Sequence, residues 1–130
     1  MSGDDTMADQ SIPHHETLTL IASDKVEGTP VFNHEGDKLG SVRTLMVDKK
    51  SGHVEYAVLS FGGMLGLGAD YYPLPWKSLN FDPDQGGYVV DIDKDLLKSA
   101  PHYSPTDEPA YDDAYGETIY SHYGVAYPLA

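Results

Sequence analysis

Short apolar runs separated by turn-forming residues are the feature of this chain that most restricts its fold. Between Thr29 and Ile92, clusters of Gly, Asn, Asp and Ser interrupt β-rich segments roughly every 10–15 residues. No long stretch of this region has the 3.6-residue period of a helix, which argues against a sheet built from βαβ units. The predicted strands are residues 29–32, 39–47, 53–61, 71–76 and 88–92. We therefore expect an all-β fold, a meander of about 5–6 strands that rolls into a small, partly open barrel.

The chain divides by composition into three parts. Residues 1–17 are polar and acidic with few large apolar side chains, so we expect a disordered leader. Residues 18–101 carry the barrel, and a short helix after its last strand is predicted from Asp93, as N-cap, to Lys98. Residues 102–130 form an acidic tail with six of the ten tyrosines.

An apolar stripe runs through the tail. Its members recur every fourth residue, which is the spacing of one helix face, and they are Tyr111, Tyr115, Ile119 and Tyr123. Gly124 follows, where a helix commonly ends. We predict a short helix over residues 112–123, whose stripe packs either on its own barrel or on a neighbouring molecule.

Charge and cysteine content limit the possible partners and sites. The net charge is −13, and all eight basic residues lie between Lys25 and Lys98, so both flanks are purely anionic. Nucleic acid is excluded as a partner, because its binding depends on Lys and Arg displacing counterions from phosphates. The chain has no cysteine and no apolar run long enough to cross a bilayer, and its N-terminus does not read as a secretory signal. We expect a cytoplasmic protein without membrane insertion.

Several segments together resemble the PRC-barrel domain family, in order over roughly residues 20–100. They include residues 22–28 and 31–40, residues 52–63, and the run from Tyr72 to Trp76. This family contains the cytoplasmic part of the photosynthetic reaction centre H subunit and the C-terminal domain of the ribosome maturation factor RimM. The tail resembles extensions of stand-alone bacterial members. The resemblance implies a barrel with a general docking role and transfers no catalytic residue.

The glycine-rich segment 62–68 is the first candidate for an interaction surface. It carries three large apolar residues, Met64, Leu65 and Leu67, although loops normally run over the protein surface. Together with the tail stripe, it suggests a non-catalytic assembly module that binds a protein partner, which we expect to be a second copy of the chain. The segment lacks the Lys-Ser/Thr pair of a phosphate-binding loop.

The alternative is a small-ligand or proton-linked binding function that uses a pocket at the barrel mouth. Small barrels can hold one ligand at an open end, and the aromatic residues that would line such a pocket are Tyr71, Tyr72 and Trp76. The sequence contains no motif of a nucleophilic enzyme and no histidine spacing typical of a zinc site, so we expect neither catalysis nor a cofactor nor a bound metal.

Overall fold

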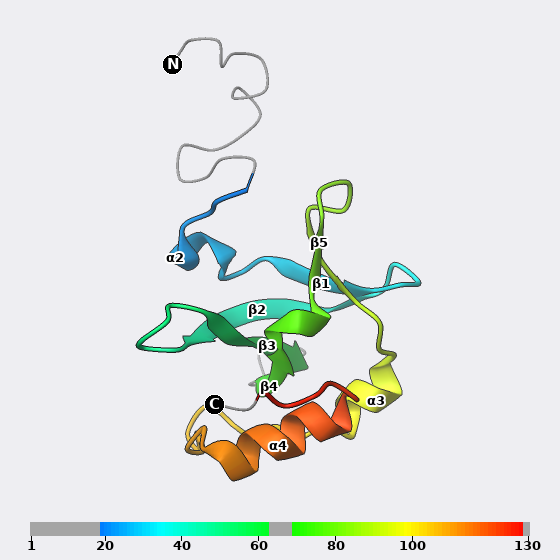
Figure 1. The fold of residues 1–130 in the computed structure, drawn as a ribbon. Coiled ribbons are helices and arrows are strands. Elements are labelled where there is room, and N and C mark those ends of the chain that lie inside the picture. The colour runs from blue at the N-terminus through cyan, green and yellow to red at the C-terminus, as the bar shows by residue number, and fades with distance from the viewer. Residues whose placement is uncertain (1–18, 63–68, 129–130) are drawn as a thin grey trace, which may run out of the picture.

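A single mixed sheet organises the part of the chain that the computed structural model describes, residues 19–62 and 69–128 (Figure 1). Six strands follow the order β4-β3-β2-β1-β6-β5, and short helices flank them. In chain order the elements are α2 (Ser23–Val26), β1 (Pro30–Asn33), β2 (Lys38–Val47), β3 (Val54–Gly62), β4 (Ala69–Pro75), the 3₁₀ turn η3 (Trp76–Ser78), β5 (Asn80–Asp82), β6 (Gly87–Val90), α3 (Lys94–Lys98) and α4 (Asp113–His122). The predicted all-β class is confirmed in that the described residues form a mostly-β structure, with short helices after the strands.

One strand pair departs from a simple meander. All pairs are antiparallel except β1 with β6, which run parallel with Val31 opposite Tyr88. Strand β5 is also additional to the predicted strands, because the sequence pattern showed only the turn that follows it. It pairs with β6, and Phe81 lies opposite Tyr88.

The barrel core lies inside the curved sheet. Strand β3 contributes Ala57 and Leu59, β4 contributes Leu74, and the fully buried Leu97 of α3 joins them. The predicted helix after the last strand is therefore present and packs into this core. Asp93 caps it as expected, since its carboxylate accepts a hydrogen bond of 2.8 Å from the backbone N–H of Leu96.

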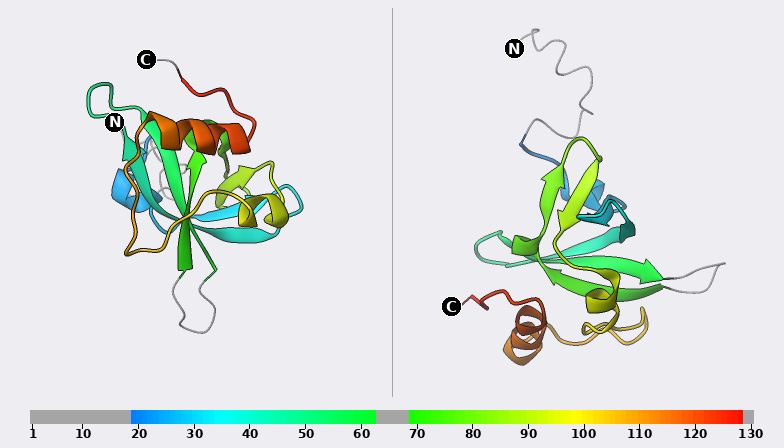
Figure 2. Two further views of the ribbon diagram at one scale, coloured as in Figure 1. Left: turned by 90° about the horizontal axis from the view of Figure 1, so that it is seen from below. Right: turned by 90° about the vertical axis from the view of Figure 1, so that its right-hand side faces the viewer.

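Strand β3 is buried on both faces. Successive side chains of a strand point to opposite sides, so Ala57 and Leu59 face the barrel core while Tyr56 faces the other way. Tyr56 packs with Ile119 and Tyr120 of α4 in a second apolar cluster. Helix α4 therefore covers the outer face of the sheet at β3 and β4, whereas α2 and β5 lie on the opposite side (Figures 1 and 2).

The tail also covers part of the β4 edge. Tyr71 and Tyr103 exchange two backbone hydrogen bonds of 2.8 and 3.0 Å, which form an isolated antiparallel bridge. Pro73 and Pro75, which cannot donate to a neighbouring strand, lie further along this edge and are fully buried. The chain's own C-terminal segment thus pairs with part of one of the two edge strands of the sheet, where unwanted pairing with another chain could otherwise occur.

Candidate functional site

The tail stripe packs on the chain's own sheet. Helix α4 begins after Asp112, whose carboxylate caps the backbone N–H of Tyr115 at 2.9 Å. Ile119 is completely buried. The other three predicted interaction residues of the tail, Tyr111, Tyr115 and Tyr123, are partly buried against the same cluster. Of the two packing modes that the sequence left open, the structure shows the intramolecular one.

The interface between the tail and the sheet consists largely of tyrosine rings in edge-on contact. Tyr111 is central to it, with ring centroids 5.2 Å from Tyr56 and 5.2 Å from Tyr115. Its hydroxyl lies 2.6 Å from that of Tyr103. Edge-to-face geometry is favourable for aromatic pairs because the positive ring edge meets the negative ring face.

Two hydroxyl groups at this interface are buried without a hydrogen-bond partner among the described residues, those of Tyr115 and Tyr123. Burial raises the pKa of Tyr115 from 10.0 to about 12. Burial also raises the pKa values of Tyr111 and Tyr123, since a phenolate would have to leave water. These side chains therefore remain neutral well above the usual titration range of tyrosine.

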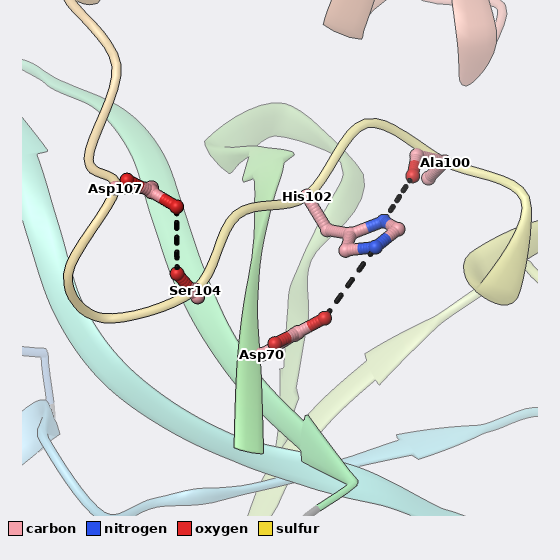
Figure 3. A network of polar contacts seen from close by, with 5 residues as sticks. All are labelled: Asp70, Ala100, His102, Ser104 and Asp107. Atoms are coloured by element: carbon pink, nitrogen blue, oxygen red, sulfur yellow. Dashed lines mark hydrogen bonds and ion pairs between the residues drawn. The ribbon is translucent and has the colours of Figure 1, made fainter. Parts of the chain in front are cut away.

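His102 holds the start of the tail against β4 (Figure 3). Its Nδ1 lies 3.0 Å from the carbonyl oxygen of Ala100, and its Nε2 lies 3.4 Å from a carboxylate oxygen of Asp70. The ring stacks on Tyr72 with a centroid distance of 4.7 Å. A ring protonated on both nitrogens donates in both polar contacts, and a neutral ring donates in only one of them.

An uncharged groove lies on the side of the barrel away from α4. It has a volume of about 480 Å³, and no described residue that lines it carries a charged side chain. Its apolar lining includes Leu20, Ile21, Leu45, Trp76, Phe81 and Tyr88. Leu20, Ile21 and Phe81 are 70%, 40% and 56% exposed, and they are three of the four large hydrophobic residues found exposed in the described ranges. Contiguous exposed apolar groups of this kind mark contact sites.

The three aromatic residues of the predicted ligand pocket do not converge. Trp76 lines the groove, but Tyr71 and Tyr72 do not. Tyr71 faces the tail, where its ring meets Tyr103 at 5.8 Å, while Tyr72 belongs to the barrel core and its ring contacts Phe61. The alternation of strand side chains separates Tyr71 from Tyr72, so they could not share one pocket wall.

The other predicted interaction residues, Met64, Leu65 and Leu67, lie outside the described residues, as does the leader. Among the residues that are described, no helix is long and apolar enough to span a membrane. No group of three or more His, Asp or Glu side chains in the same ranges is arranged to hold a metal ion.

Sequence reasoning missed the groove. The sequence placed Leu20 and Ile21 at the start of the barrel domain without a separate role. Phe81 lies between the predicted strands 71–76 and 88–92 and was assigned to neither. A usable signal was present in Asn80–Asp82 followed by a Pro-Asp-Gln-Gly-Gly turn, which is a hairpin pattern placing Phe81 on an edge strand. The exposure of Phe81 could not be inferred from the sequence, because it depends on which elements pack over β5 in the folded protein.

Comparison with known proteins agrees with this architecture. The family model of the PRC-barrel domain matches residues 19–97, which is more than half of the chain and ends within α3. No curated protein matches the sequence. The tail, including α4 and the tyrosines that it contributes to the interface, lies beyond the matched residues.

Proposed function

Because this chain belongs to the PRC-barrel domain family, we propose that it is a non-catalytic assembly module that associates with a second copy of itself through the apolar groove. One observation carries the proposal: Leu20, Ile21 and Phe81 protrude around the groove that they help to line. A two-fold dimer uses the same patch on both subunits, so that patch must be complementary to itself. A face that carries both protruding apolar side chains and a groove can meet this requirement.

Charge supports the choice of this face for self-association. Two copies at −13 each repel one another, and the tail with Asp112, Asp113 and Glu117 is strongly anionic. The described residues that line the groove are uncharged, so contact there does not bring like charges into an interface. Added salt screens the remaining repulsion and strengthens burial of apolar surface. Association should therefore increase with ionic strength, opposite to an assembly held by ion pairs.

The tail stripe has a different role in this proposal from the one that the sequence suggested. With Tyr111, Tyr115, Ile119 and Tyr123 packed on their own sheet, α4 stabilises the barrel and leaves the groove side as the docking surface. The glycine-rich segment with Met64, Leu65 and Leu67 remains a sequence-based candidate for a second contact.

The test is the solution mass of the full chain, measured by light scattering over a range of protein and salt concentrations. Phe81→Glu introduces a charge on the groove rim and should lower the apparent mass to that of a monomer. Val47→Glu is the matched control, since Val47 is 48% exposed but does not line the groove. A monomeric parent protein at high salt, or equal masses for the two variants, contradicts the proposal.

The alternative is a small ligand in the same groove, whose volume falls in the usual range for ligand sites. Trp76, Phe81 and Tyr88 are then its aromatic contacts. A thermal-shift screen of metabolites separates the two functions. A ligand at 100 times its dissociation constant raises the stability by about 2.7 kcal/mol, whatever the protein concentration.

A further inference from the structure

The described part of the chain begins at the apolar groove. Thr19 is its first residue, and Thr19, Leu20 and Ile21 all line the groove. These residues lead into α2, on the side of the barrel away from α4 (Figure 1). The leader, residues 1–17, is therefore attached through residue 18 to the groove wall itself.

The leader carries one large aliphatic side chain within reach of the groove. Ile12 is its only Ile, Leu, Val or aromatic residue, and Pro13 follows it directly. An extended chain spans at most about 3.3–3.6 Å per residue, so the connection from Ile12 to Thr19 reaches roughly 25 Å. A groove of about 480 Å³ that starts at Thr19 lies well inside this distance.

Charge directs the leader towards the groove and away from the opposite face. The leader contains Asp4, Asp5, Asp9 and Glu16 and no Lys or Arg. On the other side of the barrel, the linker and α4 expose five acids, which are Asp107, Glu108, Asp112, Asp113 and Glu117. The described residues that line the groove are uncharged. Of these two faces, only the groove can take up an anionic segment without placing like charges in contact.

We propose that the leader occupies the groove of its own chain, with Ile12 and Pro13 against Trp76 and Phe81, and so competes with a second copy for this surface. The part that concerns the second copy rests on the proposed function. Occupation by the leader is intramolecular, and a short tether gives an effective concentration in the millimolar range. A second copy has to compete with that concentration.

The competition acts twice in a two-fold dimer, because each copy must clear its own groove before the two can meet. A leader that occupies the groove half of the time leaves half of each copy competent to associate. The apparent dissociation constant of the dimer then rises about four-fold. The leader thus sets the protein concentration at which assembly begins.

Trp76 reports directly on the groove, since it is the single tryptophan of the chain and lines that surface. Quenching of its fluorescence by acrylamide, a neutral molecule, measures how far the groove is covered. The measurement is made on the full chain at protein concentrations low enough for light scattering to show a monomer. The parent value should not change on further dilution, because the cover is intramolecular.

Two variants that add the same charge to the leader make the comparison. Ile12→Asp removes the aliphatic side chain and should increase the quenching of Trp76 several-fold. Ser2→Asp is the matched control and should keep the parent value, since it leaves Ile12 in place. Neither substitution alters a residue of the described fold. In light scattering, Ile12→Asp should form dimers at a several-fold lower protein concentration than the parent protein and Ser2→Asp.

Equal quenching in the parent protein and both variants overturns the proposal. Weaker self-association of Ile12→Asp also overturns it, because the leader would then connect two copies instead of covering its own groove. A third outcome separates this inference from the proposed function. If Ile12→Asp exposes Trp76 but no form of the protein associates at any concentration, the leader does occupy the groove and the proposed self-association is wrong.

Discussion

The hydroxyl of Tyr120 donates a 3.1 Å hydrogen bond to the backbone carbonyl oxygen of Glu55, which lies 65 residues earlier in the chain. Tyr120 is on α4 and Glu55 is on β3. This bond therefore joins the tail, which lies outside the matched residues 19–97, to the barrel inside them. Three residues further along the tail, the Tyr123 hydroxyl is buried at the same interface without a partner among the described residues. The two hydroxyls should contribute to stability with opposite signs.

Replacing each of these tyrosines by phenylalanine tests that contrast. Tyr120→Phe leaves the Glu55 carbonyl without its donor and should lower the free energy of unfolding by about 1 kcal/mol. Tyr123→Phe removes an unsatisfied hydroxyl group and keeps the ring in place. Its effect on the free energy of unfolding should be neutral or stabilising by roughly 1 kcal/mol. Urea denaturation of the two variants provides the measurement. Equal destabilisation by both changes would show that Tyr123 has a hydrogen bond in solution.

Gly116 on α4 sets two physical effects against each other. Alanine favours a helix over glycine by about 1 kcal/mol at an interior position. A Cβ at residue 116, however, would lie 2.6 Å from the Tyr56 hydroxyl and would also collide with the Tyr127 ring. Since Tyr56 is buried, we expect the steric effect to prevail.

Gly116→Ala should therefore raise the helicity of an isolated peptide of residues 111–127, measured by circular dichroism, and lower the thermal midpoint of the full protein. Ser121→Ala, at an exposed position of the same helix, is the control and should leave the thermal midpoint nearly unchanged. A Gly116→Ala protein more stable than the parent would mean that Tyr56 and Tyr127 move aside easily.

Alkaline pH should release the tail. In the unfolded chain Tyr115 titrates near its ordinary pKa of 10.0, and in the folded chain burial raises the pKa to about 12. The stability that this neutral phenol contributes is complete below pH 10.0 and is lost as the pH rises towards 12, because only the unfolded form then releases the proton freely. Tyr111 and Tyr123 act in the same direction.

Phenolate absorbance and helix content, followed together between pH 9 and 12, should change in one cooperative step. Tyr115→Phe should shift that step to higher pH. Independent, gradual titration of the phenols with constant helix content would contradict the prediction.

The glycine-rich segment gives a prediction that rests on sequence alone. If Leu65 and Leu67 contribute to self-association, the double variant Leu65→Asp, Leu67→Asp should lower the mass measured by light scattering. Its effect on the free energy of association should add to that of a milder groove substitution such as Phe81→Ala, since free-energy changes at independent sites are additive. An unchanged mass and unchanged binding partners would remove this segment from the interaction surface.

Much of the fold follows from local pattern. The alternation and turn residues place β2 and β3 within one or two residues of their observed ends, and the Asp93 cap marks the start of α3. The four-residue spacing of the tail stripe predicts α4, again to within one residue. The short edge strand β5 escaped the pattern because three residues hold too little periodicity to stand out from a turn.

The sequence by itself determined the longer strands, the helices after them and which side of each is apolar, because those properties depend on neighbours a few residues apart. Only the tertiary structure decided what each apolar side contacts. It placed the Tyr111 to Tyr123 stripe on the chain's own β3 and left Phe81 at the rim of a groove. The physical reason is that burial depends on contact between surfaces that are distant in sequence. The same apolar stripe could pack equally well on its own barrel or on a neighbouring molecule.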